Sequence, residues 1–303
     1  MEQSCHISVL KEEVVELLRA AHGGRFLDCT LGGGGHVQAL LNANSTVSVV
    51  AADRDARAII RANRRFENSA ERCRIMHSTF SELKDALKGE KFDGILADLG
   101  LSTDQLKESR GFSFSDKTPL DMRMDESQEM SASHVVNKTT QRELVTVLRK
   151  GGVGKEAVPI AAAIIKARPI KSTDKLSETV SHALKGRYRE KKGNPATVVF
   201  QAIRIAVNRE FEELEALLDT VPKLIKPKGR LAVISFHSLE DKVVAHKMRQ
   251  WQSQGRYPAL WRGPRKEKPL GKMITKKAVV PQADELRENP AARSARLRVF
   301  EFE

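Results

Sequence analysis

Four successive glycines, in the run TLGGGGH from Thr30 to His36, are the first feature of the sequence that points to ligand chemistry. Glycine lets the backbone approach a ligand closely, and the amides at a helix N-terminus attract anionic groups. Nicotinamide cofactors, flavins and methyl donors all use loops of this kind, but the run does not continue as the GxGxxG pattern of dinucleotide sites. The loop therefore favours a methyl donor such as S-adenosylmethionine, and a simple tight turn is the alternative.

Asp53 follows an apolar run about 20 residues beyond the loop, where an acidic side chain of a nucleotide-binding sheet accepts hydrogen bonds from ribose hydroxyls. We expect this role for Asp53. Two alternatives remain open: an ion pair with Arg54 or Arg57, or a cap on a helix that begins near Asp55.

Asp98, in the run ILADLG, ends a further apolar segment. Open α/β sheets bind ligands at the carboxyl ends of their strands, so the reacting methyl group is expected here. Enzymes that methylate exocyclic amines often carry two prolines and an aromatic residue after such an acid, and this sequence does not. Asp98 is therefore the one weak candidate for a catalytic residue, and catalysis is otherwise unassigned. Phe80 is expected either to pack on adenine or to belong to the core.

The elements that must position these residues alternate between strand and helix over the first hundred residues. The predicted strands are 25–28, 47–53, 73–77 and 92–99, and the predicted helices are 10–18, capped by Ser8, 37–42, 55–66 and 81–87. This alternation predicts a parallel sheet.

The pattern changes after about residue 104. Three helices are predicted at 139–150, 155–166 and 172–185, followed by a basic linker at 186–194. Strand and helix signals then resume, with a long helix at 197–218, a turn at 222–229, a strand at 230–236, a helix at 239–251 and an edge strand at 297–302. The sequence thus predicts an α/β sheet with an inserted all-helical domain.

The charge balance favours a polyanionic partner, because 52 lysines and arginines outnumber 39 acidic residues and give a net charge of +13. Three widely spaced cysteines indicate neither a disulfide framework nor a metal site. The first residues do not resemble a signal peptide, and no apolar run approaches the roughly 18 residues of a spanning helix. We therefore expect a cytoplasmic protein with no metal and no membrane association.

Five segments resemble, in order, the bacterial ribosomal RNA small subunit methyltransferase H family, also called MraW. They are DLGLSTDQL, RGFSFSDKTPLDMRMD, NPATVVFQAIRIAVNRE, ISFHSLEDKVV and ENPAARSARLRV. The resemblance spans almost the whole chain. It implies a Rossmann-like class I methyltransferase sheet formed by residues 1–104 and 194–303, with a helical RNA-recognition insertion at 105–193. It also implies methyl transfer from S-adenosylmethionine to the N4 amine of a cytidine in 16S ribosomal RNA.

The resemblance also implies roles for individual residues. The cofactor would be bound by Gly34, Gly35, His36, Asp53, Phe80, Asp98 and Gln105. From spacing alone, His36 could instead make a surface contact at a helix start, and Gln105 could be a solvated helix residue. The weaker candidates for substrate contacts are Arg110, Arg123, Asn194 and His237.

Alternatives stay open at several of these positions. Asp121, Arg123 and Asp125 either line the acceptor pocket or form an ion-pair network, and His237 either reaches the cleft or caps a helix. Aromatic residues alternate with arginines and lysines between residues 249 and 268. Trp251, Tyr257 and Trp261 either stack on bases or belong to a mobile basic loop.

The partner expected from these features is ribosomal RNA or the assembled small ribosomal subunit. The oligomeric state stays open, with a homodimer among the alternatives. Competing functions are a methyltransferase acting on DNA or protein, a nicotinamide-dependent oxidoreductase, and a non-catalytic RNA-binding ribosome-assembly protein that retains a donor pocket.

Overall fold

The computed structural model describes residues 8–113, 117–185, 196–253 and 268–303. The chain divides into two compact units, one formed by residues 1–100 and 213–303 and the other by residues 101–212. All the strands of the described sheet lie in the first unit, and the second unit is helical.

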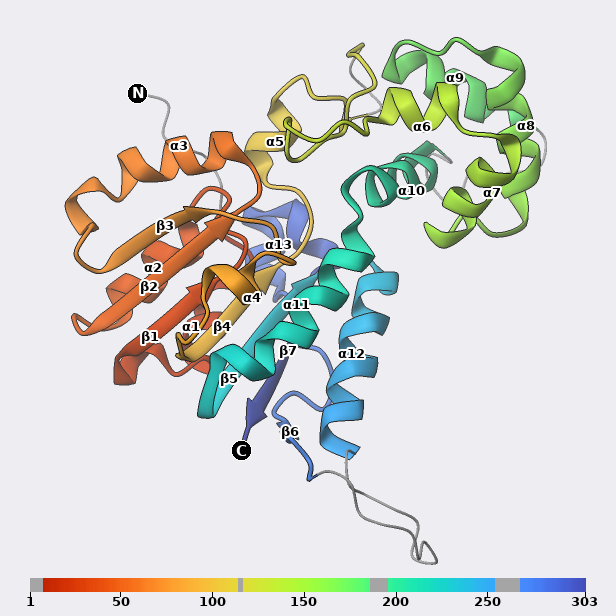
Figure 1. Ribbon diagram of the computed structural model, residues 1–303. Helices are drawn as coiled ribbons and strands as arrows, with labels where there is room; N and C mark the ends of the chain where they lie inside the picture. The colour runs from red at the N-terminus through yellow and green to blue at the C-terminus, as the bar shows by residue number, and fades with distance from the viewer. Residues whose placement is uncertain (1–7, 114–116, 186–195, 254–267) are drawn as a thin grey trace, which may run out of the picture. The chain divides into compact units, whose positions relative to one another are not determined.

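The first unit contains a seven-stranded sheet with the order β3-β2-β1-β4-β5-β7-β6 (Figure 1). Its strands are β1 (Gly24–Asp28), β2 (Val47–Asp53), β3 (Cys73–His77), β4 (Phe92–Asp98), β5 (Ile225–Ser235), β6 (Gly271–Met273) and β7 (Arg296–Phe302). The first five strands pair in parallel, and β7 runs antiparallel to both β5 and β6. The expected α/β class and the Rossmann-like sheet of class I methyltransferases are confirmed.

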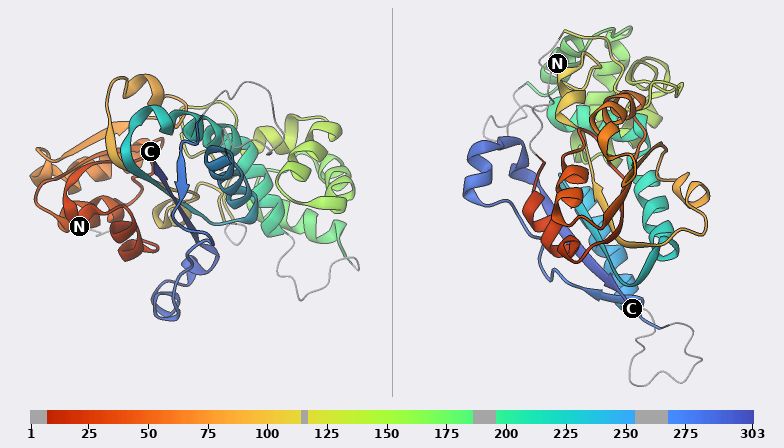
Figure 2. Two further views of the ribbon diagram at one scale, coloured as in Figure 1. Left: turned by 90° about the horizontal axis from the view of Figure 1, so that it is seen from below. Right: turned by 90° about the vertical axis from the view of Figure 1, so that its left-hand side faces the viewer.

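Helices cover both faces of this sheet, which is why its central strands read as continuous apolar runs. On one face lie α1 (Lys11–Leu17), α2 (Gly35–Ala43), α3 (Ala56–Arg65) and α13 (Ala283–Glu288). On the other lie α4 (Leu83–Ala86), α11 (Glu210–Leu224) and α12 (Ser238–Ser253). Figure 2 shows these two layers from two further directions.

The second unit consists of short helices around their own apolar core. They are α5 (Thr103–Lys107), α6 (Ala132–Lys138), α7 (Gln141–Lys150), α8 (Ala157–Ala167), α9 (Thr173–Ala183) and α10 (Ala196–Asn208). Helix α10 contributes buried residues such as Val199 and Ile203 to this core, although the sequence suggested a return to the sheet domain at residue 194. Helix α6, capped by Ser131, was not predicted.

The single helix predicted at 197–218 is wrong. Helix α10 ends at Asn208, Arg209 takes a left-handed conformation with φ 49°, and α11 begins at the next residue. The buried Asn208 side chain donates to the carbonyl of Met122 and accepts from the N–H of Met124, each at 2.8 Å. These contacts hold the chain at the point where the helix breaks.

The turn predicted at 222–229 is also wrong. Pro222 lies inside α11, and β5 begins directly after that helix. The residues that suggested a turn form an irregularity in β5, where pairing with β4 shifts between Phe92 and Gly94. Lys228 adopts φ 65° there, which is how the sheet absorbs the extra residues.

The prediction that the last strand lies at the edge of the sheet is wrong. β7 pairs with β5 on one side and with the three-residue β6 on the other. The edge is β6, which is too short to be visible as a period-two pattern. A Cβ at Gly271 in β6 would come within 2.0 Å of the Glu301 carbonyl oxygen, so this edge strand requires glycine.

Two further predictions are wrong. Ser8 does not cap α1, because the helix begins after Leu10 without a side-chain cap. Trp251 does not offer a free stacking face, since it is buried against Phe300 and Phe302, with ring centroids 5.3 Å from each. The other predicted stacking residues lie outside the described residues. Among the described helices, none has the length and apolar composition needed to cross a membrane.

Candidate active site

Three aspartates end three adjacent parallel strands of the first unit. Asp28 ends β1 and is in register with Ala51 of β2 and Leu96 of β4. Asp53 and Asp98 lie two residues beyond those positions, so the three side chains belong to the same face of the sheet. The glycine loop leaves β1 between the other two acids, which places it between Asp53 and Asp98.

Backbone hydrogen bonds attach the start of the loop to both neighbouring strands. Cys29 donates to the carbonyl of Leu96 in β4, and Leu31 donates to the carbonyl of Ala52 in β2, each at 2.9 Å. The loop is therefore a continuation of the sheet and not a free segment.

Thr30 connects two of the acids. Its hydroxyl accepts a 2.6 Å hydrogen bond from the backbone N–H of Asp98 and lies 3.3 Å from Oδ1 of Asp28, to which it donates. The same Asp28 oxygen accepts from the backbone N–H of Thr30 at 3.0 Å. A single side chain thus fixes the ends of β1 and β4 relative to each other.

His36, in the first turn of α2, is buried with its Nε2 3.4 Å from Oδ2 of Asp98. Burial lowers the pKa of His36, but the hydrogen-bonding and charge effects of Asp98, together with the charge of Asp28, raise it, and the net shift is upward. The structure therefore brings His36 and Asp98 together, as a cation and an anion when the imidazole is protonated. The surface-contact alternative for His36 does not hold, because the side chain is only 5% exposed.

Asp28 was missed by the sequence reasoning, although it is almost completely buried at the centre of this group. Burial raises its pKa to about 6, against the lowering effect of His36 and of the hydrogen bond from Thr30. The signal that could have found it is the one that found Asp53 and Asp98, an acid at the carboxyl end of an apolar strand.

Asp53 holds the glycine loop in place. One carboxylate oxygen accepts from the N–H of Gly32 at 2.7 Å, and the other accepts from the N–H of Asp55 at 2.8 Å. The cap of α3 is Asp55 itself, which accepts from the N–H of Arg57. The capping alternative for Asp53 is therefore wrong. Burial raises the pKa of Asp53, and these two backbone bonds oppose that shift.

The structure gives packing reasons for the glycines at 34 and 35. Gly34 has φ 78°, and a Cβ there would lie 2.7 Å from the ring of Phe66. A Cβ at Gly35 would lie 2.0 Å from the hydroxyl of Ser8. Gly34 therefore disfavours a larger residue even before a ligand is considered, whereas at Gly35 the Ser8 hydroxyl would have to rotate away.

The acids at the strand ends and the start of α2 have unsatisfied polar atoms that could bind a charged cofactor. Among the described residues, Asp28 Oδ2 and Asp98 Oδ1 are buried without a hydrogen-bond partner. Gly34, the N-cap of α2, provides no side-chain cap, so the first amides of that helix lack the usual acceptor. The methionyl end of S-adenosylmethionine carries an ammonium and a carboxylate, which match these acids and these amides.

The other predicted cofactor residues have different surroundings. Phe80 is partly buried and packs against the apolar core of the α4 and α11 face, so it at least fulfils the core alternative. Gln105 lies in the second unit, where it completes a capping box with Ser102 at the start of α5. It is buried and is not the solvated residue of the alternative interpretation.

Arg110 and Arg123 are engaged inside the second unit. Arg123 makes a two-point ion pair with Asp121, at 2.7 and 2.9 Å, and donates to two nearby carbonyls. Arg110 donates to the carbonyls of Arg123 and Met124. The ion pair predicted from the sequence as an alternative for Asp121 and Arg123 is observed. Both guanidinium groups bind backbone carbonyls of the segment 123–128 and so stabilise it.

His237 behaves as a helix cap. Its Nδ1 accepts from the N–H of Glu240 at 3.2 Å, and the Glu240 carboxylate accepts in return from the N–H groups of Phe236 and His237. This reciprocal arrangement begins α12. Asn194, the remaining substrate candidate, lies outside the described residues.

Comparison with known proteins decides the family. The profile of the MraW methylase family matches residues 3–303. The chain belongs to the MraW methylase family. A curated relative from Picosynechococcus, named ribosomal RNA small subunit methyltransferase H, is 43% identical over 98% of this chain and 96% of its own length. A protein of the same name from Koribacter versatilis is 39% identical over 98% of this chain and 94% of its own length.

Membership confirms the expected family, a methyltransferase activity and S-adenosylmethionine as the cofactor. In this MraW methylase, the acids at the strand ends, the glycine loop and the start of α2 lie close together within the first unit.

Proposed function

We propose that this MraW methylase transfers a methyl group from S-adenosylmethionine to the N4 amine of a cytidine in 16S ribosomal RNA. Its curated relatives carry the name ribosomal RNA small subunit methyltransferase H. The observation that carries the proposal is the pair of buried carboxylate oxygens on Asp28 and Asp98 beside the uncapped start of α2.

Bound S-adenosylmethionine supplies an electrophilic methyl group on a positively charged sulfur. Asp28 is suited to its ammonium, and the amides of Gly35 and His36 are suited to its carboxylate. Each Asp53 oxygen accepts one backbone N–H and retains acceptor capacity for the ribose hydroxyls. Phe80 supplies an apolar face for the adenine. These residues bind and orient, which is the main requirement of an in-line transfer.

The cytosine amine is a weak nucleophile because its lone pair is delocalised into the ring. An acceptor that holds the amine protons favours the pyramidal nitrogen needed for bond formation. Asp98 can act in this way through Oδ1, since Oδ2 faces His36 and Thr30 holds the backbone. His36, whose pKa is raised, contacts the other oxygen of this carboxylate, so Oδ1 is the oxygen left to accept a hydrogen bond from the amine.

The target cytidine must be unpaired or turned out of its helix, because a stacked base cannot enter a protein pocket. We assign recognition of the surrounding RNA to the helical insertion. The substrate is either free ribosomal RNA or the assembled small subunit.

The test is transfer of labelled methyl from S-adenosylmethionine to ribosomal particles and to naked RNA from cells that lack this protein. Nucleoside analysis identifies the product. Labelled N4-methylcytidine in either substrate supports the proposal, and the better substrate identifies the natural form of the RNA. Size measurement in the same buffer tests whether a homodimer is the active form.

Donor binding without transfer to either RNA form would favour the alternative of a non-catalytic ribosome-assembly protein. Transfer to another nucleoside would retain the methyltransferase and overturn the acceptor.

A further inference from the structure

Helix α3 carries four arginines and no acidic residue in its ten positions. Arg57, Ile60 and Arg64 are spaced three and four residues apart, so they share one face of the helix, and all three are exposed. Ile60 is 55% exposed. The opposite face, with Ala58 and Ala62, is buried. The helix therefore presents a strip of positive charge, interrupted by one apolar side chain, to solvent.

This strip adjoins the donor loop at both ends of the helix. Helix α3 starts just after Asp53, whose carboxylate binds Gly32. At its other end, Arg65 donates to the carbonyl of Gly33, and the Phe66 ring packs against Gly34. A polyanion bound along α3 would therefore pass close to the loop that holds the methyl donor.

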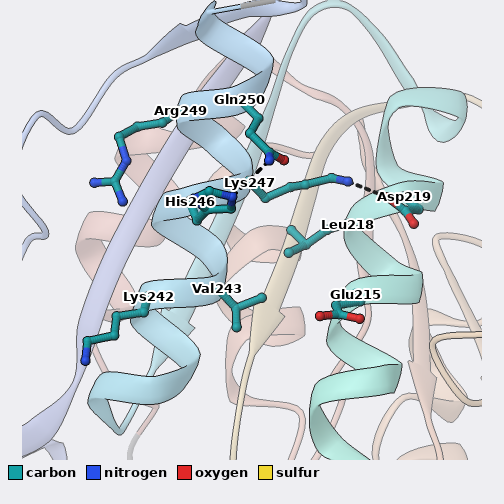
Figure 3. A pocket seen from close by; sticks show the side chains of 9 residues that line it. All are labelled: Glu215, Leu218, Asp219, Lys242, Val243, His246, Lys247, Arg249 and Gln250. Atoms are coloured by element: carbon teal, nitrogen blue, oxygen red, sulfur yellow. Dashed lines mark hydrogen bonds and ion pairs between the residues drawn. The ribbon is translucent and has the colours of Figure 1, made fainter.

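A second cationic helix of the same unit has different surroundings. Lys242, His246 and Arg249 of α12 are exposed beside a hollow of about 570 Å³ between α11 and α12 (Figure 3). Acidic side chains of α11 line the other side of this hollow, and one of them, Asp219, lies 2.5 Å from Lys247 of α12. The mixed charge makes the hollow less suited to a polyanion than the α3 face.

Resting on the proposed function, we propose that the exposed α3 face binds the phosphate backbone of the RNA substrate, with Arg57 and Arg64 as the contacts. Guanidinium groups form strong, charge-assisted hydrogen bonds to phosphate oxygens. Their position beside the donor loop assigns them the RNA segment next to the target cytidine.

The matched variants are Arg57→Gln with Arg64→Gln on α3, and Lys242→Gln with Arg249→Gln on α12. Each pair removes two positive charges seven residues apart on an exposed helix face of the first unit. RNA affinity is measured by titration of ribosomal RNA at several salt concentrations, independently of methyl transfer. S-adenosylmethionine binding is measured by calorimetry.

The α3 variant is expected to weaken RNA binding roughly tenfold and to reduce the salt slope by about 1.4, since each single-strand phosphate contact contributes about 0.7. Its affinity for S-adenosylmethionine and its melting temperature should stay unchanged. The α12 variant should keep the native RNA affinity.

Native affinity and slope in the α3 variant would overturn the inference, as would an equal loss in the α12 variant. Failure of the proposed function is distinguishable, because it would appear as absent methyl transfer by the native protein whatever the α3 variant does in the titration.

Discussion

The backbone N–H of Asp98 donates a 2.6 Å hydrogen bond to the hydroxyl of Thr30. This bond joins the end of β4 to the loop that leaves β1, and the same hydroxyl continues to Asp28. The acid proposed to meet the substrate is thus positioned by a residue of the donor loop.

Replacing Thr30 by valine keeps the side-chain shape and removes this hydroxyl. The Asp98 N–H then lacks its acceptor, which is expected to cost about 1–3 kcal/mol of folding stability. Displacement of Asp98 should lower methyl transfer by roughly tenfold to a hundredfold. Chemical denaturation and kinetics measure the two effects, and Thr30→Ser should restore both. Loss of transfer in the serine variant would contradict the positioning role.

Asp53→Ala should abolish binding of S-adenosylmethionine and leave RNA affinity nearly unchanged, because it releases Gly32 and removes the proposed ribose acceptor. Asp55→Ala is the neighbouring control. It removes the cap of α3, at about 1 kcal/mol, but no donor contact. Calorimetry and RNA titration compare the two variants. Lost RNA binding with intact donor binding in Asp53→Ala would refute the assignment.

The raised pKa of Asp28 predicts a pH dependence. Only the ionised carboxylate attracts the donor's ammonium, so affinity for S-adenosylmethionine should fall as the pH drops through about 6, by at most tenfold per pH unit. Asp28→Asn should bind weakly and without this dependence. A flat calorimetric profile for the native protein between about pH 5 and 8 would contradict the role of Asp28.

The same shift has the opposite effect on stability. The folded state holds the Asp28 proton more tightly than the unfolded state does, whose pKa is near 3.8, so the protein loses stability as the pH rises from about 4 to about 6. At neutral pH, Asp28→Asn should therefore be more stable than the native protein, by at most about 3 kcal/mol. Thermal unfolding at two pH values tests this sign.

Gly34→Ala and Gly89→Ala separate packing from backbone strain. Both glycines have positive φ, 78° and 83°, so each alanine is expected to cost about 1–2 kcal/mol. Only at position 34 does the new Cβ meet another side chain, the Phe66 ring. Gly34→Ala should be the more destabilising change and should also weaken donor binding. Equal losses of stability and unaffected donor binding would show that the Phe66 contact is unimportant.

Substitutions at His237 distinguish two roles for this side chain, an N-cap of α12 and a contact to the substrate. Asparagine is a good N-cap residue, so His237→Asn should retain stability, whereas His237→Ala should lose about 1 kcal/mol. If His237 acts only as the N-cap of α12, His237→Asn should keep native methyl transfer. A stable but inactive asparagine variant would instead assign the imidazole to the substrate.

Much of the sheet could be predicted because buried parallel strands leave long apolar runs, and because acids such as Asp53 and Asp98 follow them directly. Asp28 carries the same signal, but the apolar run before it is only two residues long, Phe26 and Leu27, so the signal is weaker there. The break at Arg209 was not predictable, since it depends on Asn208 contacts to residues more than eighty positions away. The position of β7 between β5 and β6 likewise depends on tertiary contacts and not on a local sequence pattern.

Gly34 packs against Phe66 and Gly35 against Ser8, so part of the glycine loop is constrained by protein packing as well as by any ligand. A descendant that had lost methyl transfer would still lose stability on replacing Gly34, so a glycine at this position reports ancestry. Buried carboxylates with an unpaired oxygen are costly to keep without a ligand. In a lineage whose site no longer bound its ligands, Asp28 and Asp98 should therefore be among the first residues to change, and their retention marks a chain still selected to bind them.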